Sequence, residues 1–268
     1  MNSAKIVLVT GVSSGIGRTT AQQFAHSGCT VFGTVRRAAT AEPLPGVTLI
    51  EMDVRDSDSV QRAVAEVHRH AGRIDVLVNN AGVNLTGAVE ETSIAEAQSL
   101  FETNVFGVMR TIQAVLPQMR EQRSGRIVNV SSVLGFLPAP YMGMYSASKH
   151  AIEGLSESLD HELRQFNIHV TLVEPAYAKT SLDANSPVAK ATLSVYDRER
   201  VAAAAAVARD INNAPSPDNV ARTIVDAALG KWQMRRTPPG QASLLRRVRR
   251  FLPAAPVDAS LRKQFGLT

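Results

Sequence analysis

The sequence has a single cysteine and no long apolar run, and each shortage excludes a class of protein. Cys29 is the only cysteine among 268 residues, which excludes an intramolecular disulfide framework and fits a reducing compartment. No stretch of about 18 apolar residues occurs, so we expect no membrane-spanning helix. The chain runs from Met1–Lys5 straight into an apolar segment, without the pattern of a signal peptide. We therefore expect a cytoplasmic protein.

Metal-ligand patterns and strong charge are also missing. His150, His161 and His169 have no ligand-spaced cluster of histidine, cysteine and carboxylate around them, so we expect no metal. The 29 lysines and arginines exceed the 24 acidic residues by only five, an excess that can attract anionic ligands but also arises by chance. With 44% hydrophobic and 20% charged residues the composition is that of a soluble globular protein. We expect no nucleic-acid partner.

Short β-branched runs alternate with helix-period segments, which predicts βαβ units and a parallel sheet buried on both faces. The expected strands are Ile6–Val9, Thr30–Val35, Val47–Met52, Ile74–Val78, Arg126–Val130 and Ile168–Val173. The expected helices are Ile16–His26, a segment capped by Ser57 that runs to His70, Ile94–Met119 and Tyr145–Gln165. We expect an α/β fold, a doubly wound Rossmann-type sheet with helices on both faces. No linker divides the chain, so a single domain over residues 1–268 is expected.

The alternation of strand and helix patterns becomes less regular after residue 176. Helical patterns recur near Val201–Arg209 and Asp218–Leu229, and a long excursion after the last strand predicts a substrate lid at about 177–215. A C-terminal extension follows at about 235–268. It carries Arg246, Arg247, Arg249 and Arg250 among Leu244, Leu245, Val248, Phe251 and Leu252. This amphipathic basic pattern fits a membrane surface or an anionic partner, and it fits better a helix packed on its own domain.

A glycine-rich loop follows the first strand and leads directly into a helix. It reads Thr10-Gly-Val-Ser-Ser-Gly-Ile-Gly17. In such a loop the first glycine permits a tight turn, the second lets the backbone approach a diphosphate, and the third allows close packing of helix on strand. The position between strand and helix predicts dinucleotide binding rather than a purely structural turn. The expected contacts are Gly11, Ser13, Ser14, Gly15, Ile16 and Gly17.

The end of the second strand indicates which nucleotide is bound. An acidic residue about 20 residues after the loop would hold the ribose hydroxyls of NAD, but the strand ends Thr34-Val35-Arg36-Arg37. Two guanidinium groups suit a 2′-phosphate, so we expect NADP(H) as the cofactor. Asp53 and Val54 follow the third strand and are candidate cofactor contacts. Asp53 either accepts a hydrogen bond from the adenine amino group or caps the turn after it.

The motifs resemble those of the short-chain dehydrogenase/reductase family over roughly residues 5–180, in order and in spacing. The glycine loop is similar to the family's Thr-Gly-x-x-x-Gly-x-Gly, and Asn79-Asn80-Ala81-Gly82 is similar to its Asn-Asn-Ala-Gly, which adds Asn80, Ala81 and Gly82 to the expected cofactor contacts. The residues that match the catalytic tetrad are Asn104, Ser132, Tyr145 and Lys149. The basic pair after the second strand and the long C-terminal extension resemble the steroid and retinol dehydrogenase-like branch.

The spacing of Tyr145 and Lys149 has a chemical reason. Residues four apart share one helix face, so both side chains can reach one site, and a neighbouring ammonium lowers the pKa of a phenol from its usual value near 10. Tyr145 can then act as base in alcohol oxidation and as acid in carbonyl reduction. The resemblance further implies that Lys149 bonds the nicotinamide ribose, that Ser132 bonds the substrate oxygen and that Asn104 supports a proton relay.

Each of these residues also has an ordinary structural interpretation. Ser132 can be a turn former, Asn104 a helix-kink or cap residue, Tyr145 a partly buried tyrosine and Lys149 a surface lysine. Considered one at a time, the four residues favour those structural interpretations. The whole set beside a glycine loop favours a hydride-transfer site.

One motif departs from the family pattern. The family's Pro-Gly-x-x-x-Thr is here Pro175-Ala-Tyr-Ala-Lys-Thr180, with Ala176 in place of glycine. If that position needs a positive φ, alanine costs about 1 kcal/mol or the turn shifts. By resemblance, Pro175, Ala178 and Thr180 are further cofactor contacts, while the Tyr177 ring covers the substrate entrance or packs on the lid.

The function expected from these residues is NADP(H)-dependent interconversion of a carbonyl and a secondary alcohol on a hydrophobic small-molecule substrate, such as a steroid, retinoid or lipid. The alternative is a regulatory protein that binds NADP(H) but turns nothing over. The resemblance also implies a homodimer or homotetramer, formed through the two long helical segments.

Overall fold

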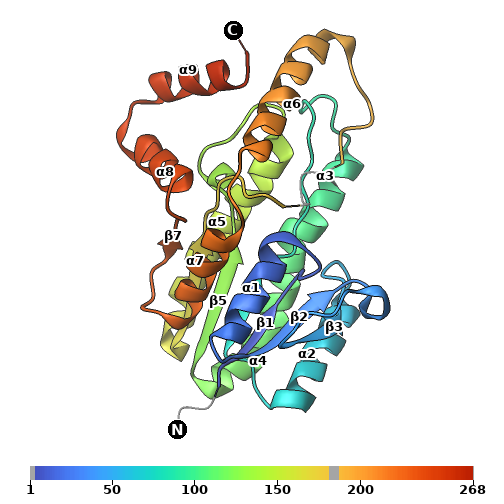
Figure 1. The fold of residues 1–268 in the computed structure, drawn as a ribbon, viewed down its shortest axis with the longest axis vertical. Helices are drawn as coiled ribbons and strands as arrows, with labels where there is room; N and C mark the ends of the chain where they lie inside the picture. Colours follow the sequence, from blue (N-terminus) through green and yellow to red (C-terminus); the bar gives the residue numbers. More distant parts are fainter. Residues whose placement is uncertain (1–3, 181–186, 268) are drawn as a thin grey trace.

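The structure is a computed structural model that describes residues 4–180 and 187–267. Within this part of the chain, one parallel sheet of seven strands has the order β3-β2-β1-β4-β5-β6-β7 (Figure 1). The strands are β1 (Ile6–Val9), β2 (Thr30–Val35), β3 (Val47–Glu51), β4 (Val76–Asn79), β5 (Gly125–Val130), β6 (Ile168–Val173) and β7 (Arg235–Arg236). The expected α/β fold with a doubly wound sheet is confirmed.

Three of the predicted strands have ends that differ by one or two residues, and one strand was not predicted. β3 ends at Glu51 instead of Met52, β5 begins at Gly125, and β4 is Val76–Asn79 instead of Ile74–Val78. β7 lies at the edge of the sheet, where it pairs with the end of β6. A strand of two arginines has no apolar pattern, so only its neighbour in space makes it recognisable.

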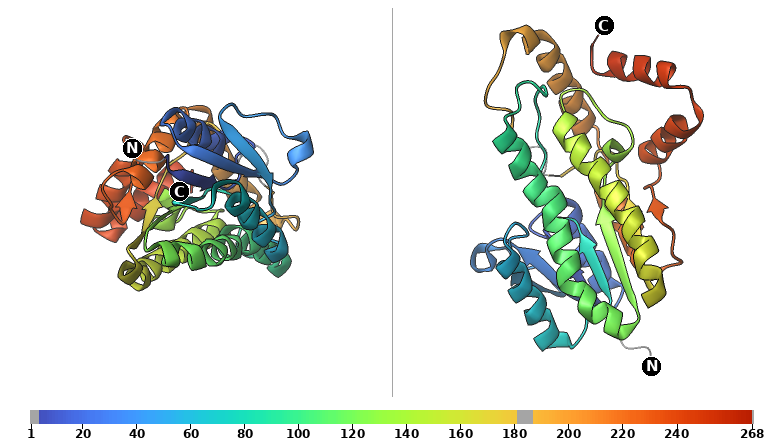
Figure 2. Two further views of the ribbon diagram at one scale, coloured as in Figure 1. Left: turned by 90° about the horizontal axis from the view of Figure 1, so that it is seen from below. Right: turned by 180° about the vertical axis from the view of Figure 1, so that it is seen from behind.

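Helices cover both faces of the sheet. α1 (Gly15–His26) and α7 (Asp218–Leu229) pack together on one face, and the opposite face carries α2 (Ser57–Ala71), α4 (Gly107–Gln122) and α5 (Gly143–Leu163) (Figures 1 and 2). Strands covered on both sides are apolar throughout. In β1, for example, Val7, Leu8 and Val9 are fully buried.

Two helix predictions need correction. The pattern Ile94–Met119 is not one helix, because a π-helical turn at Glu102–Phe106 separates α3 (Ile94–Phe101) from α4. The cap of α2 is Asp56 rather than Ser57, since the Asp56 carboxylate accepts hydrogen bonds from the backbone amides of Asp58 and Ser59. Gly72 ends α2 in the left-handed conformation, as a C-terminal glycine commonly does.

The C-terminal third contains more helix than the pattern predicted. α6 (Asp197–Asn212) is longer than Val201–Arg209, whereas α8 (Gln241–Phe251) forms at the basic segment, where a helix was the favoured interpretation. α9 (Ala254–Gln264) was not predicted, because its sequence has little amphipathic pattern. In the parts of the chain that the structure describes, no helix combines the length and the apolar run that a bilayer crossing needs.

The strand order reverses between β1 and β4, and this reversal positions the site. The connections after these two strands leave the sheet toward opposite faces, so a crevice opens at the carboxyl ends of the strands. The glycine loop, the residues after β4 and the residues after β5 and β6 all converge there.

Candidate active site

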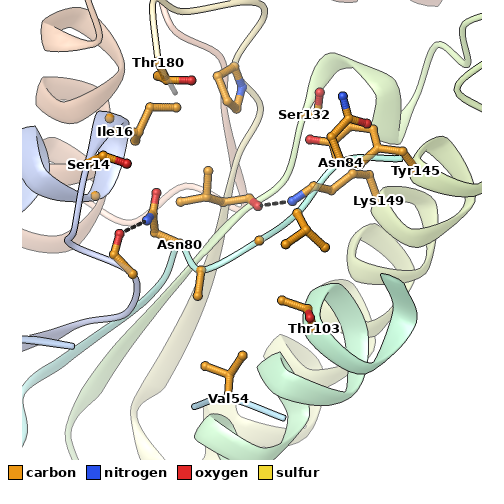
Figure 3. Close-up of a pocket in the computed structure, with 18 of the residues that line it drawn as sticks. Ser14, Ile16, Val54, Asn80, Asn84, Thr103, Ser132, Tyr145, Lys149 and Thr180 are labelled. Carbon is orange, nitrogen blue, oxygen red and sulfur yellow. Dashed lines mark hydrogen bonds between the residues drawn. The ribbon is translucent and has the colours of Figure 1, made fainter. Parts of the chain in front are cut away.

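A pocket of about 780 Å³ lies at the carboxyl ends of the strands (Figure 3). It brings together most of the residues predicted from the sequence: Gly11, Ser13, Ser14, Gly15, Ile16, Gly17, Arg36, Asp53, Val54, Asn80, Ala81, Gly82, Ser132, Tyr145, Lys149, Pro175, Ala178 and Thr180. Arg37 and Asn104 are not among its lining residues. Figure 3 shows Ser14, Ile16 and Thr180 on one side of the pocket and Ser132, Tyr145 and Lys149 on the other.

The glycine loop is shaped so that larger residues do not fit. Gly11 and Gly15 have φ values of 72° and 57°, a region that favours glycine. A Cβ on Gly17 would stand 2.2 Å from the carbonyl oxygen of Gly11 and 2.3 Å from Nδ2 of Asn80. The loop therefore lies directly on the start of α1, and the N-terminus of this helix faces the pocket.

Asn80, the residue after the neighbouring strand β4, holds the glycine loop in place by hydrogen bonds. Its Nδ2 donates to the carbonyl oxygens of Thr10 (2.9 Å) and Gly11 (3.0 Å), and the backbone amides of Asn80 and Ala81 donate to Oγ1 of Thr10 at 3.0 and 2.9 Å. These bonds tie the loop after β1 to the residues after β4. Asn80 thus holds the shape of the loop as well as lining the pocket.

The two arginines after β2 have different positions. Arg36 lines the pocket, whereas Arg37 lies in the exposed turn that follows and does not. Asp53 faces the same end of the pocket and is engaged by Arg55, which donates to its carboxylate from the backbone amide and from the side chain. These hydrogen bonds and the charge of Arg55 lower the pKa of Asp53. Asp53 therefore caps the turn after β3, and because it also lines the pocket its contact with the adenine amino group stays a prediction.

Tyr145 and Lys149 lie one turn apart near the start of α5 and both line the pocket. The Lys149 Nζ donates to the carbonyl oxygen of Val130 at 2.9 Å and stands 5.6 Å from the centre of the Tyr145 ring. The lysine is only 8% exposed. Burial lowers its pKa to about 8, and the negative charge of Glu153 opposes this shift. Lys149 is thus a buried amine beside a tyrosine, not the surface lysine of the ordinary interpretation.

Ser132 is the residue before a short 3-10 turn at Val133–Gly135. Its Oγ accepts a hydrogen bond of 3.2 Å from the amide of Leu134, so it is a turn former. The same hydroxyl lines the pocket and retains its own proton for donation. The structural and the chemical interpretation of Ser132 are therefore compatible.

Asn104 lies behind the pocket, in the π-helical turn. Its Nδ2 donates to the carbonyl oxygen of Val83 (2.8 Å) and to Oγ of Ser148 (3.2 Å), and its Oδ1 accepts from the amide of Val83 (2.9 Å). Asn104 thus fixes the segment after β4 and connects it to α5. The irregular turn aims this side chain at Val83, as π-turns often do at functional sites.

The alanine at position 176 causes no strain. In the described part of the chain the non-glycine residues with positive φ are Arg123, Tyr141 and Asn167, so Ala176 keeps an ordinary backbone conformation. Ala176 and Tyr177 both line the pocket.

Of the expected lid, residues 181–186 lie outside the described residues. Pro187 lines the pocket, and Val188 forms a bridge with Thr86.

Sequence patterns missed several residues that line or support the site. Thr10, described above, belongs to the glycine motif but received no role of its own. Asn79 ends β4 and Asn129 lies within β5. The Asn79 side-chain amide donates a hydrogen bond of 2.9 Å to Oδ1 of Asn129, and Asn79 Oδ1 accepts one of 2.6 Å from the Thr111 hydroxyl. Polar residues inside strands that should be fully apolar are the signal that could have found this network.

The glycine loop fits a dinucleotide, since the absence of a side chain at Gly17 lets the loop lie on the start of α1 and the cavity is large enough to hold a cofactor. The described residues contain no group of three or more histidine, cysteine or carboxylate side chains that could hold a metal ion.

The doubly wound parallel sheet places this chain in the Rossmann-type α/β class. A model of the short chain dehydrogenase family matches residues 5–191, and the chain belongs to this family of oxidoreductases. It is 43% identical to a 3-ketodihydrosphingosine reductase of Bacteroides thetaiotaomicron, over 70% of this chain and 69% of that protein. It is 41% and 40% identical to the bovine and human retinol dehydrogenase 8, over 68% and 67% of this chain.

These relatives agree with the resemblance to the steroid and retinol dehydrogenase-like branch. The match spans less than two thirds of the retinol dehydrogenases, 62% of the bovine and 60% of the human protein. Among solved structures, a short-chain dehydrogenase from Streptomyces avermitilis has a TM-score of 0.83 at 37% identity, covering 98% of this chain and 96% of that one. A short chain dehydrogenase/reductase from Burkholderia phymatum in complex with NAD has a TM-score of 0.78 at 28% identity, covering 96% and 95%.

Proposed function

We propose that this protein is an NADP(H)-dependent oxidoreductase that interconverts a carbonyl and a secondary alcohol on a hydrophobic substrate, with Tyr145 as the acid and base. The observation that carries the proposal is the convergence of Tyr145, buried Lys149 and Ser132 on the same pocket as the glycine loop. A packing role alone does not require a buried amine beside a tyrosine at the edge of a nucleotide-sized cavity.

The proposed mechanism assigns one task to each side chain. A bound nicotinamide supplies or accepts the hydride at the substrate carbon. In reduction the Tyr145 hydroxyl gives its proton to the carbonyl oxygen, and in oxidation the phenolate takes the alcohol proton back. The charge of Lys149 favours the phenolate, and the Ser132 hydroxyl donates a hydrogen bond to the substrate oxygen. Asn104 keeps the segment around Val83 in place.

The choice of NADP(H) rests on the end of β2. Arg36 lines the pocket there, and no acidic residue occurs between Thr34 and Arg37 to hold the ribose hydroxyls of NAD. The neighbour from Burkholderia phymatum was solved with NAD. The family fold therefore does not decide the cofactor, and Arg36 carries this part of the proposal.

A hydrophobic substrate is supported by the walls of the pocket and by the names of the relatives. Val133, Leu134, Met142, Tyr177 and Pro187 line it. The reductase from Bacteroides is named for a sphingoid ketone and the mammalian relatives for retinol, and both are lipid-like compounds. We therefore propose a steroid-, retinoid- or lipid-like ketone or alcohol as the substrate class for this chain.

The test is a fluorescence titration with NADPH and with NADH, on the wild type and on the variants Arg36→Ala and Arg37→Ala. Removing Arg36 should weaken NADPH binding at least tenfold, because charge-assisted hydrogen bonds to the 2′-phosphate are lost. Arg37→Ala is the matched control and should bind almost like the wild type. Equal affinity of the wild type for both nucleotides would refute the NADP(H) assignment.

Turnover is tested with a panel of hydrophobic ketones and alcohols. Tyr145→Phe should bind the nucleotide normally and lose nearly all activity. A wild type that binds NADPH but converts no substrate of the panel would favour the regulatory protein instead.

The proposal extends to assembly and location. α4 and α5, with 16 and 21 residues, lie on the same face of the sheet (Figure 2). We propose a homodimer or homotetramer formed through them and a cytoplasmic location. Light scattering on the purified protein tests the assembly, and a monomer would refute it.

A further inference from the structure

α8 is attached to the protein by its charged side. Arg246 pairs with the buried carboxylate of Glu174, and its guanidinium lies 6.0 Å from the centre of the Phe136 ring. Arg249 donates to the carbonyl oxygen of Phe136 at 3.4 Å. Ala242 is the buried apolar residue of the helix. The polar contacts that hold α8 on the body thus come from arginines, while its largest apolar side chains are not the ones buried there.

The apolar side of α8 faces outward. Leu244 is 61% exposed, Phe251 76% and Leu252, the residue after the helix, 50%. Leu244 and Phe251 are seven residues apart and share one side of the helix. Figures 1 and 2 show α8 and α9 at the outer edge of the molecule, beyond β7. Two large side chains on an exposed helix face and a third beside it indicate a surface that binds something apolar.

Positive charge surrounds these residues. Residues 231–268 contain nine lysines and arginines and one acidic residue, whereas the whole chain has a net charge of only +5. Residues 1–230 therefore carry a small net negative charge, and the positive charge is concentrated near α8. Arg247 and Arg250 are both exposed, and the helix period places them along one border of the row of Leu244 and Phe251. An apolar row bordered by arginines is the pattern of a helix that lies in a lipid–water interface.

We propose that α8 docks this protein on an anionic lipid surface. Leu244, Phe251 and Leu252 enter the boundary of the acyl chains, while Arg247 and Arg250 contact lipid phosphates. The eleven residues of α8 are too few to span a bilayer, so this docking is peripheral. A second copy of the chain is the weaker occupant, because a two-fold contact would bring the same arginines against one another.

The position of α8 relates this surface to the pocket. α8 contacts the Val133–Gly135 turn, which supplies Val133 and Leu134 to the pocket wall. Phe265, beyond α9, packs in the same apolar cluster as Met142 and Tyr145. Docking through α8 would hold this end of the pocket near the lipid, where a hydrophobic substrate dissolves. This last step rests on the proposed function, whereas the docking itself does not.

The experiment is flotation of the full-length protein with vesicles of phosphatidylcholine alone and of phosphatidylcholine with phosphatidylserine. We expect binding to the phosphatidylserine vesicles only, and a loss of binding at high salt. The double variant Arg247→Gln, Arg250→Gln should bind about 25-fold more weakly, since each arginine near an anionic surface contributes about fivefold. The double variant Leu244→Ser, Phe251→Ser should bind at least tenfold more weakly.

Matched controls remove similar residues elsewhere. Arg62→Gln with Arg69→Gln removes two exposed arginines of α2, and Ile94→Ser with Val201→Ser removes two exposed apolar residues, 75% and 68% exposed. Both controls should bind vesicles like the wild type. If the controls lose as much vesicle binding as the α8 variants do, the proposal is overturned.

Reduction of a water-soluble ketone by NADPH, without vesicles, separates this proposal from the proposed function. An enzyme that is active but stays off both vesicle types overturns the docking. A protein that is inactive on this ketone and on the whole hydrophobic panel, yet binds phosphatidylserine vesicles through α8, supports the docking and refutes the proposed function. If light scattering shows a dimer that Leu244→Ser, Phe251→Ser converts to a monomer, and no vesicle binds, the face is an interface between copies and the docking is wrong.

Discussion

Lys149 donates a hydrogen bond of 2.9 Å to the backbone carbonyl of Val130, so its ammonium group is fixed at the end of β5. The side chain is almost fully buried, and burial lowers its pKa to about 8, against the charge of Glu153 one turn further along α5. A lysine with such a pKa changes its charge within the pH range of ordinary enzyme assays.

This relationship predicts how activity depends on pH. The protonated lysine is present below its pKa, so activity that needs its charge should fall as the pH rises through about 8. Glu153 raises the pKa of Lys149, and Glu153→Gln should therefore move this decline to lower pH and reduce kcat/KM several-fold near pH 8. The measurement is a profile of kcat/KM against pH. Glu157→Gln, on the same helix, is the control, and an equal displacement in both variants would contradict the prediction.

Two glycine-to-alanine substitutions should have opposite effects on stability. Gly17→Ala places a Cβ 2.2 Å from a backbone oxygen, so the loop must move, and we expect loss of nucleotide binding with a stability loss of roughly 1–3 kcal/mol. Gly154→Ala, in α5, meets no described atom within 4 Å and should stabilise the protein by up to about 1 kcal/mol. Thermal unfolding and NADPH titration of both variants provide the comparison. Normal NADPH binding by Gly17→Ala would show that the loop tolerates the side chain.

Asn104 should contribute more to the free energy of unfolding than its hydrogen-bond partner Ser148. Asn104→Ala leaves the amide and the carbonyl of Val83 without their side-chain partner, which should cost about 2 kcal/mol in the free energy of unfolding and weaken nucleotide binding. Ser148→Ala removes the bond from Asn104 and the bond that the Ser148 hydroxyl donates to the carbonyl oxygen of Tyr145 within α5, and it should cost about 1 kcal/mol. Urea unfolding measures both. Equal losses in the two variants would mean that the bonds to Val83 contribute little.

Glu174 and Arg246 predict a stability effect that depends on pH. Burial and the charge of Glu153 raise the pKa of Glu174 to about 7, while Arg246 lowers it. Because this pKa lies above the usual value for glutamate, the folded protein loses stability as the pH rises through about 7. Arg246→Met raises the pKa further, so its stability loss should be small in weak acid and grow to roughly 2–4 kcal/mol at alkaline pH.

The control for this effect is a second change in the same pair. In the double variant Glu174→Gln, Arg246→Met no buried carboxylate remains at position 174, so most of the pH dependence should disappear. Arg249→Met, on the same helix but bonded to a carbonyl, should show little dependence on pH. Urea unfolding at several pH values decides, and an Arg246→Met loss that is constant with pH would exclude a charge effect.

The fold could be predicted from the sequence because its signals are local. Strands buried on both faces are apolar throughout, as in β1 and β6, and the glycine loop marks the turn from β1 into α1. The predictions were wrong where the signal was not local. β7 consists of two arginines, and the break between α3 and α4 is a π-helical turn within an otherwise continuous helical pattern.

The sequence by itself determined the class of fold and most of the residues that line the candidate site, because motif order and the spacing of Tyr145 and Lys149 are properties of the chain. Only the tertiary structure decided which of two adjacent arginines lines the pocket, that Asp53 is engaged by Arg55, and that Ala176 keeps an ordinary backbone. It also decided that α8 turns Arg246 inward and Leu244 and Phe251 outward. These outcomes depend on neighbours distant in sequence, such as Glu174 beneath Arg246, and a local pattern carries no information about such neighbours.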